Sequence, residues 1–196
     1  MILEILGFSI GILYLWWEYH ADRRVWLASV IMPMISMWIY FSKGLYADFS
    51  INIYYLVIAF YGFIAWTRGG GKEKHKKTEL PISHITWGVT GLCVAASALL
   101  WWLIWLLLTR FTDSTVPVAD AFTTALSIVG MWMMARKYAE QWLVWIVVDL
   151  VSAGLYFYKG IYFYSGLYAI YTVVACFGYR KWLRMIPGNN RMCGDN

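Results

Sequence analysis

The sequence predicts an all-α integral membrane protein with seven transmembrane helices, built as two three-helix repeats around one linker helix. Three observations predict this class: an apolar composition, seven long apolar runs and an internal repeat. The 196 residues are 61% hydrophobic and only 14% charged, and they include 13 tryptophans. Soluble domains carry about 25% charged residues. A chain of this size needs lipid to cover so much apolar surface, which argues against a soluble helical bundle.

Polar breaks divide the chain into seven apolar runs. Each run is long enough to cross roughly 30 Å of hydrocarbon at about 1.5 Å per residue. Tryptophan and tyrosine at the run ends suit the membrane–water interface. A transmembrane β-barrel would need alternating ten-residue strands, which the sequence lacks. The runs lie at Leu3–Tyr19, Val25–Ser42, Ala47–Trp66, His84–Leu108, Val118–Ala135, Gln141–Tyr158 and Ile161–Tyr179.

The distribution of lysine and arginine predicts the orientation. Placing the amino terminus outside puts 13 basic residues in the cytoplasmic loops and 3 in the outer loops. Cytoplasmic loops carry the excess of basic residues in membrane proteins, so we expect the carboxy terminus inside. The longest polar segment contains the basic run Lys72–Lys77. An ordinary cytoplasmic loop explains this run, and the net charge of +5, better than a nucleic-acid or lipid-binding patch.

The chain repeats itself, without a gap, at an offset of 116 residues. Thirteen identities fall within the 41 positions from Trp26 to Trp66 when they are laid over Trp142 to Trp182. Shared apolar composition would not align a Lys-Gly pair, a mid-helix glycine and several tryptophans in one register. The identical pairs include Lys43/Lys159, Gly44/Gly160, Tyr55/Tyr171, Ala59/Ala175, Gly62/Gly178 and Trp66/Trp182.

The repeat predicts the domain organisation. An odd number of linker helices keeps both halves in the same orientation, so the repeats are expected to be parallel about an axis along the membrane normal. We expect a first three-helix bundle at 1–66, a cytoplasmic loop at 67–83, and linker helix four with an outer loop at 84–117. A second bundle at 118–182 and a cytoplasmic tail at 183–196 complete the chain.

Several motifs together resemble the PnuC family of vitamin transporters. They are KGLYAD at Lys43–Asp48, YG at Tyr61–Gly62 before Trp66, LSIVGMWMMARK at Leu126–Lys137, QWLVWIVVDL at Gln141–Leu150 and LYFYKG at Leu155–Gly160. The resemblance covers nearly the whole chain and implies the SWEET-like 3+1+3 fold. It also implies the bacterial inner membrane and passive vitamin uptake, with trapping by a cytoplasmic kinase.

Two features favour the PnuT branch of that family, whose substrate is thiamine. The chain lacks the amino-terminal extension associated with many nicotinamide riboside carriers. Ala59 also stands where riboside carriers resemble one another in having asparagine. Thiamine is therefore the first expectation, and nicotinamide riboside is the alternative.

One face of the sixth run carries the main candidate for solute binding. Trp145, Asp149, Ser152 and Tyr156 follow one another at helical spacing. An acid inside a membrane span is costly, and it indicates function by default. An aromatic ring beside a carboxylate suits a flat cationic ring such as thiazolium or pyridinium. The alternative is that Asp149 only bonds a neighbouring helix, although its repeat mate Pro33 shows that the scaffold does not need the acid.

The third and seventh runs present related stripes that could share a central cavity. On the third run, Asn52, Tyr55, Ala59 and Trp66 lie on one face, and Asn52 offers an amide to a hydroxyl or an aminopyrimidine edge. Tyr168 is the repeat mate of Asn52, and Tyr171 is the mate of Tyr55. Ordinary helix packing is the alternative explanation for these stripes.

A smaller group of residues suggests moving parts or helix ends. Pro33 would interrupt backbone bonding in mid-span and is a candidate hinge. Trp66 and Trp182 are either gates or interface anchors at the cytoplasmic ends. Glu4 and Asp120 head their helices, where an acid suits the positive helix end or attracts a cation. Three further residues lie near span ends and are expected to be solvated: Glu18, His20 and His84.

The sequence contains no nucleotide, nucleophile or metal motif, and no cofactor is expected. Cys93, Cys176 and Cys193 show no spacing typical of a metal site or a disulfide framework. We therefore expect facilitated diffusion of a small vitamin, with lipid and a kinase as partners, no nucleic acid, and an oligomer left open. The competing classes are a membrane-embedded enzyme that uses Asp149 or Glu18 as acid or base, and a non-catalytic scaffold.

Overall fold

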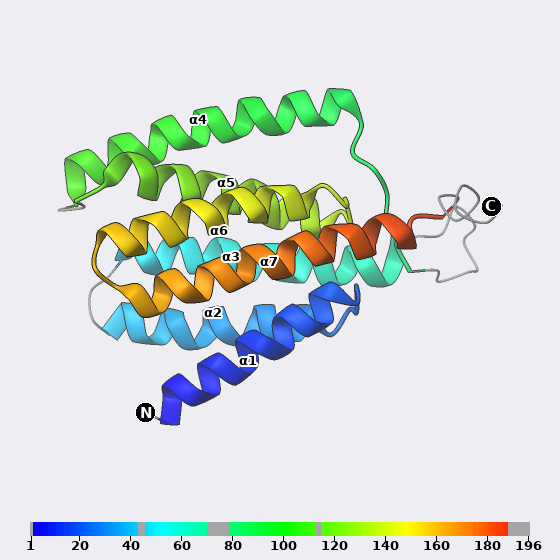
Figure 1. The fold of residues 1–196 in the computed structure, drawn as a ribbon, viewed down its shortest axis with the longest axis horizontal. Helices are drawn as coiled ribbons and strands as arrows, with labels where there is room; N and C mark the ends of the chain where they lie inside the picture. The colour runs from blue at the N-terminus through cyan, green and yellow to red at the C-terminus, as the bar shows by residue number, and fades with distance from the viewer. Residues whose placement is uncertain (1, 43–45, 70–78, 113–114, 188–196) are drawn as a thin grey trace. The chain divides into compact units, whose positions relative to one another are not determined.

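The computed structural model describes residues 2–42, 46–69, 79–112 and 115–187. The described chain forms seven α-helices and one isolated bridge between Ser83 and Tyr138 (Figure 1). The basic run at 72–77, the Lys-Gly pair at 43–44 and Cys193 lie outside the described residues. The helices are α1 (Ile2–Tyr19), α2 (Val25–Ser42), α3 (Tyr46–Arg68), α4 (Trp87–Phe111), α5 (Pro117–Ala135), α6 (Gln141–Tyr158) and α7 (Tyr162–Met185).

The seven predicted runs are confirmed as seven helices, with small shifts at their ends. The bounds of α2 and α6 are those that the apolar runs predict. Helices α3 and α7 continue past the apolar stretch to Arg68 and Met185, because basic residues extend a helix without being apolar. Three helices of the described chain, α4, α5 and α6, are long and apolar enough to cross a membrane by length and composition.

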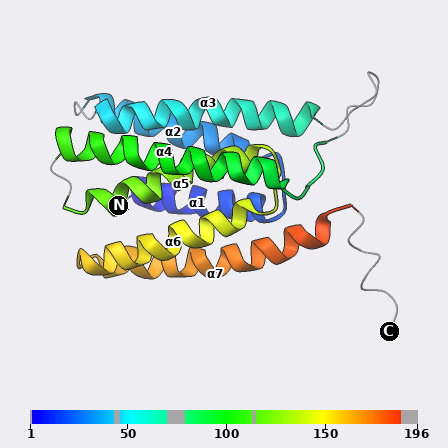
Figure 2. The same ribbon diagram turned by 90° about the horizontal axis from the view of Figure 1, so that it is seen from above.

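The chain divides into two compact units. Residues 1–81 with 135–137 form the first unit, in which α2 packs along α3 and α1 packs on α2. Residues 82–134 with 138–196 form the second unit. There α6 and α7 form an antiparallel pair that runs side by side along its length (Figures 1 and 2). The most apolar helix, α4, belongs to the second unit and buries none of its described side chains.

Each unit contains the same tryptophan–glycine contact. In the first unit, Trp26 of α2 meets Trp66 of α3 edge to face at 5.5 Å between ring centroids, and Gly62 lies under the Trp26 ring. In the second unit, Trp142 meets Trp182 at 5.8 Å. There a Cβ added at Gly178 would come within 2.8 Å of the Trp142 ring. These contacts are related by the offset of 116 residues found in the sequence, while the parallel twofold arrangement and the domain limits stay predictions.

Candidate functional site

The α6 face that carries Asp149 is buried within the second unit. Asp149 is the one charged residue of α6 and lies about midway along the helix. Asp149 and Ser152 are each 8% exposed, and Tyr156 is half-buried. Burying a charge is costly unless it is paired. The structure therefore places the predicted acid where a partner is needed.

Tyrosines of α7 surround the carboxy-terminal half of this face. The ring of Tyr156 stacks on Tyr168 at 5.3 Å and 16°, and on Tyr164 at 5.5 Å and 29°. Tyr171 meets Tyr168 edge to face at 5.8 Å. Asp149 interacts electrostatically with both Tyr168 and Tyr171. Four of the predicted residues, from two helices, are thus brought together.

The Asp149 carboxylate has no hydrogen bond or ion pair within the part of the chain that the structure describes. The interpretation that Asp149 serves only to bond a neighbouring helix gains no support from these contacts. An unpaired carboxylate beside stacked aromatic rings offers a cationic ring both a counter-charge and a stacking surface.

Trp145 is placed on the side of α6 that faces α5. Its ring lies against Gly130, where an added Cβ would come within 3.6 Å of the indole. The indole Nε1 is buried and has no hydrogen-bond partner among the described residues. A buried donor without a partner is costly, so this N–H is available to an acceptor on a ligand.

The predicted residues of the first unit are also mostly buried. Asn52 is 8% exposed and Ala59 is fully buried. Tyr55 is half-buried beside Tyr54, at 5.7 Å between ring centroids, and it interacts electrostatically with Tyr14 of α1. A cavity shared by this stripe and the α7 stripe stays a prediction.

Tryptophans 66 and 182 are not interface anchors. Their side chains are 1% and 0% exposed, because each packs against the second tryptophan of its unit. Pro33 is buried inside α2, which continues through it from Val25 to Ser42. The gating role of the two tryptophans and the hinge role of Pro33 stay predictions.

The structure corrects one expectation about helix ends and adds partners to two other residues. Glu18 is only 2% exposed, so it is not solvated. His84 is exposed as expected, but it pairs with Glu140 at 2.7 Å. Asp120 in the first turn of α5 pairs with Lys159 at 3.3 Å, a partner that the sequence pattern did not suggest.

Sequence reasoning missed Lys137, which it counted only as one of the cytoplasmic charges. Lys137 is 4% exposed, and its Nζ lies 4.3 Å from the centre of the Trp66 ring. Burial lowers the pKa of this lysine, while the charges of Glu79 and Asp22 oppose the shift. A positive φ of 55° also marks the residue. The repeat mate of Lys137 is Ala21. This replacement of a small apolar residue by a lysine was the feature of the sequence that could have singled Lys137 out.

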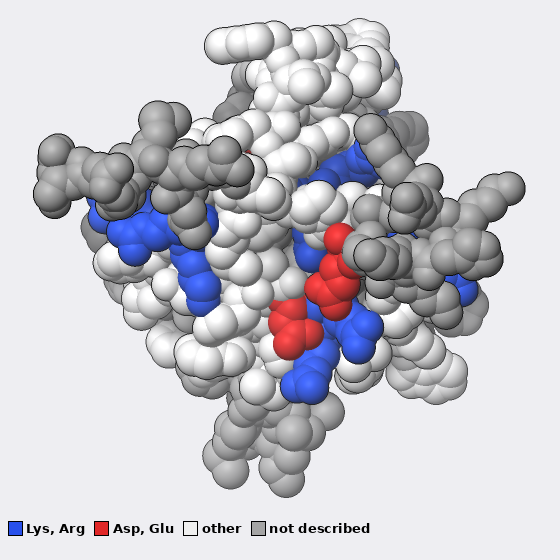
Figure 3. All heavy atoms as spheres, turned by 90° about the vertical axis from the view of Figure 1, so that its right-hand side faces the viewer, with Lys and Arg blue, Asp and Glu red and all other residues white. Residues whose placement is uncertain are grey.

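A polar hollow lies beside this group. It has a volume of about 340 Å³ and is lined by His20, Ala21, Asp22, Arg23, Arg24 and Glu79. The space-filling view of this side shows acidic and basic side chains next to one another (Figure 3). Charges of both signs alternate here, so the hollow favours neither an anion nor a cation.

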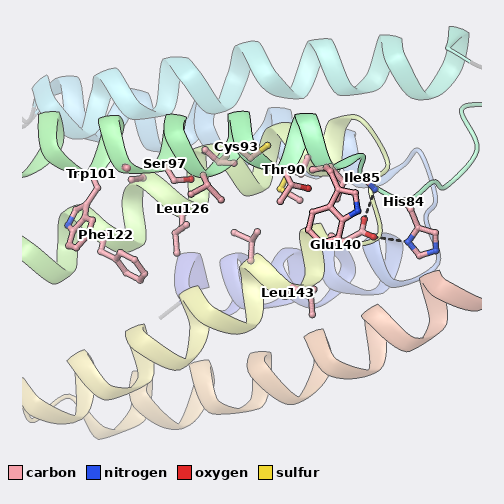
Figure 4. Close-up of a pocket in the computed structure, with 17 residues that line it drawn as sticks. His84, Ile85, Thr90, Cys93, Ser97, Trp101, Phe122, Leu126, Glu140 and Leu143 are labelled. Atoms are coloured by element: carbon pink, nitrogen blue, oxygen red, sulfur yellow. Dashed lines mark hydrogen bonds and ion pairs between the residues drawn. The ribbon is translucent and has the colours of Figure 1, made fainter.

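A second hollow, within the second unit, is separate from the Asp149 face. A cavity of about 760 Å³ lies between α4, α5 and α6 (Figure 4). Its walls are mainly apolar, and none of the predicted site residues lines it. No group of three or more metal-ligating side chains occurs among the residues described by the structure.

Comparison with known proteins identifies the family. The family model described as nicotinamide mononucleotide transporter matches residues 1–184. The chain belongs to this family. A crystal structure of the vitamin B3 transporter PnuC matches the fold with a TM-score of 0.68 and 24% identity, covering 92% of this chain and 80% of that one. The seven-helix architecture is therefore that of this family.

Curated relatives of this family member are transporters of two vitamins. The riboflavin/roseoflavin transporter RibM of Streptomyces davaonensis is 30% identical over 128 residues, which cover 65% of this chain and 59% of RibM. The nicotinamide riboside transporter PnuC of Neisseria mucosa is 24% identical over 82% of this chain and 64% of its own length. The nicotinamide riboside transporter PnuC of Escherichia coli is 28% identical over 168 residues, which cover 74% of this chain and 70% of that protein. The chain thus spans less than two thirds of RibM and of the Neisseria protein.

Proposed function

We propose that this chain is a membrane transporter for a small vitamin, with nicotinamide riboside as its first candidate substrate. The observation that carries the proposal is the buried Asp149, which has no hydrogen bond or ion pair among the described residues and lies beside the stacked tyrosines of α6 and α7. The pyridinium ring of nicotinamide riboside is flat and cationic, so it matches both features. The family to which the chain belongs supports transport over the enzyme and scaffold alternatives.

The relatives reverse the order of substrates expected from the sequence. Relatives that carry nicotinamide riboside or riboflavin match this chain, and none of those named above is a thiamine transporter. The argument for thiamine rested partly on Ala59, which is fully buried. Thiamine is therefore the second candidate, since its thiazolium ring would satisfy Asp149 equally well.

The charge of the site favours a riboside over a mononucleotide. A phosphate ester carries about −1.5 to −2 charges at neutral pH. Such a group would bring like charge toward Asp149, whereas the riboside brings only a cation. The same argument ranks neutral riboflavin below both cationic vitamins, although its flat ring could stack on Tyr156.

Substrate-induced stabilisation tests the proposal. The purified protein is heated with nicotinamide riboside, thiamine, riboflavin and, as a neutral control, nicotinamide. A ligand at about 100 times its Kd stabilises the folded protein by about 2.7 kcal/mol. We expect the largest shift with nicotinamide riboside and none with nicotinamide. If no vitamin raises the melting temperature, the transporter proposal loses its support.

Transport in liposomes tests the mechanism. No nucleotide-binding motif was found, so we propose facilitated diffusion, with accumulation provided by a kinase. Protein-containing liposomes should take up the riboside only to equal concentrations, without ATP or an ion gradient. Enclosing a riboside kinase with ATP should then drive accumulation. Uptake above equilibrium without the kinase would show ion coupling and contradict facilitated diffusion.

A further inference from the structure

The second unit holds a slot that runs between two points at which the α4 segment is attached to the rest of the unit. At one end, Ala139 N–H donates to the Ser83 carbonyl at 3.0 Å, and the Glu140 carboxylate accepts from the Ile85 N–H at 3.0 Å. At the other end, Trp101 Nε1 donates to the Val118 carbonyl at 2.9 Å. The 760 Å³ cavity lies between these two attachments (Figure 4).

Mainly apolar side chains of α4 and α5 make the walls of the slot. Small residues of α4 face it, namely Cys93, Ser97 and Ala98, and Leu126 and Val129 of α5 stand opposite. The Thr90 hydroxyl donates to the carbonyl of Thr86, within its own helix turn. Few polar groups of the walls are therefore left to bind water. A water molecule in a cavity needs two to four polar partners.

The dimensions of the slot fit one hydrocarbon chain. From Thr90 to Trp101, α4 rises about 16 Å at 1.5 Å per residue. One leaflet contributes about half of the roughly 30 Å of hydrocarbon in a bilayer. The edge-to-face contact between Trp101 and Phe122, at 5.3 Å, closes the far end near this depth. A void of this kind inside a bilayer is filled by lipid hydrocarbon.

The open end carries a carboxylate with spare capacity. Glu140 accepts one bond on each oxygen, from His84 and from the Ile85 N–H, and a carboxylate offers about four lone-pair positions. The Glu140 side chain is 19% exposed. Trp87, the first residue of α4, also lines the cavity and is 92% exposed, which suits an aromatic residue at a membrane–water interface. This end suits a cationic group that donates hydrogen bonds.

We propose that the slot between α4 and α5–α6 binds one acyl chain of a phospholipid whose headgroup amine reaches Glu140. A primary ammonium has three donors for the carboxylate. A phosphoglycerol headgroup has no cation, and a quaternary choline has no N–H donor. Phosphatidylethanolamine is therefore the lipid selected by this end of the slot. The lipid fills the space between α4, which has no buried side chain among its described residues, and helices α5 and α6 of the same unit.

Native mass spectrometry of the full chain tests the site. The protein is purified from membranes, exchanged into equal amounts of phosphatidylethanolamine and phosphatidylglycerol, and released from detergent. We expect one retained phosphatidylethanolamine per chain. Ala98→Trp fills the slot and should lower the lipid-bound fraction about tenfold. Ala95→Trp is the matched control, because Ala95 is exposed on α4 and does not line the slot.

A second pair of variants tests headgroup recognition. Glu140→Gln keeps an acceptor for the Ile85 N–H but removes the charge, so the preference for the amine lipid should vanish. Glu79 is an exposed acid outside the slot, so Glu79→Gln should leave the preference for the amine lipid unchanged. Equal lipid retention by the Ala98→Trp and Ala95→Trp variants would overturn the proposal. So would an oligomer that only Ala98→Trp dissociates, because a second copy would then occupy the slot.

Discussion

The loop between α1 and α2 and the loop between α5 and α6 have the same backbone but different side chains. The Asp22 N–H donates to Trp17 O at 2.9 Å, and the Tyr138 N–H donates to Met133 O at 3.1 Å. Ala21 and Lys137, which precede these donors, have φ angles of 52° and 55°. Both pairs are 116 residues apart.

What differs between the repeats is charge and polarity. Lys137 replaces Ala21 at the left-handed loop position, Asp149 replaces Pro33 in mid-helix, and Tyr168 replaces Asn52. The shared positions hold the backbone and the tryptophan–glycine packing, whereas the changed positions carry buried ionisable groups. The comparison teaches that function is to be sought where the two sequence repeats differ, and a duplicated three-helix scaffold stays a prediction.

The largest expected effect comes from replacing the glycines of the tryptophan–glycine contacts that both units share. Gly178→Ala places a methyl group within 2.8 Å of the Trp142 ring, and Gly62→Ala meets Trp26 in the same way. We expect each to destabilise the protein by about 1–3 kcal/mol through overpacking. Gly166→Ala, on the same helix as Gly178 but in open space, is the control. Melting temperatures in detergent that match the control would show that the contact is not part of the scaffold.

The divergent acid is tested by Asp149→Asn. Removing the charge leaves the shape of the side chain, so the fold should persist while affinity for nicotinamide riboside falls about tenfold or more. Asp120→Asn is the matched control, since that acid is paired with Lys159 instead of being unpaired. Affinity is read from ligand-dependent melting. Equal affinity in both variants would exclude Asp149 from the site.

The divergent lysine is tested by its pH dependence. Burial lowers the pKa of Lys137 below that of an ordinary lysine, so the unfolded chain binds more protons between these two values. The contribution of Lys137 to stability therefore rises with pH in that window, by at most about 1.4 kcal/mol per pH unit. Lys137→Met should remove this rise in a comparison of melting curves with wild type, whereas Arg136→Met should keep it. A rise that survives Lys137→Met would contradict the assignment.

The smallest expected effect is the difference in stability between glycine substitutions at the left-handed positions of the two loops. Ala21→Gly relieves a left-handed backbone conformation and should stabilise the protein by about 0.5–1 kcal/mol. Lys137→Gly relieves the same strain but loses the contact with Trp66, so its gain should be smaller. Calorimetry or a thermal shift assay can order the two. A larger gain for Lys137→Gly would mean that the Trp66 contact is not stabilising.

The sequence was sufficient to predict the seven helices. Length and hydropathy determine a transmembrane helix almost alone, because a backbone in lipid must satisfy its own hydrogen bonds. The bounds of α2 and α6 followed directly. Part of the site also followed, since helical spacing places Asp149 and Tyr156 on one face and intramembrane acids are rare.

Tertiary structure decided what the helical faces meet. Spacing along α7 gave no reason to single out Tyr164, which stacks on Tyr156 across two helices. Trp66 ends its apolar run and Trp182 lies just past the end of its own, so both resemble interface anchors, yet packing against a second tryptophan buries them. The burial of Lys137 over Trp66 and the slot beside α4 likewise depend on contacts between residues far apart in sequence. Hydropathy records how well a residue tolerates lipid or water, and it does not record which neighbour will cover it.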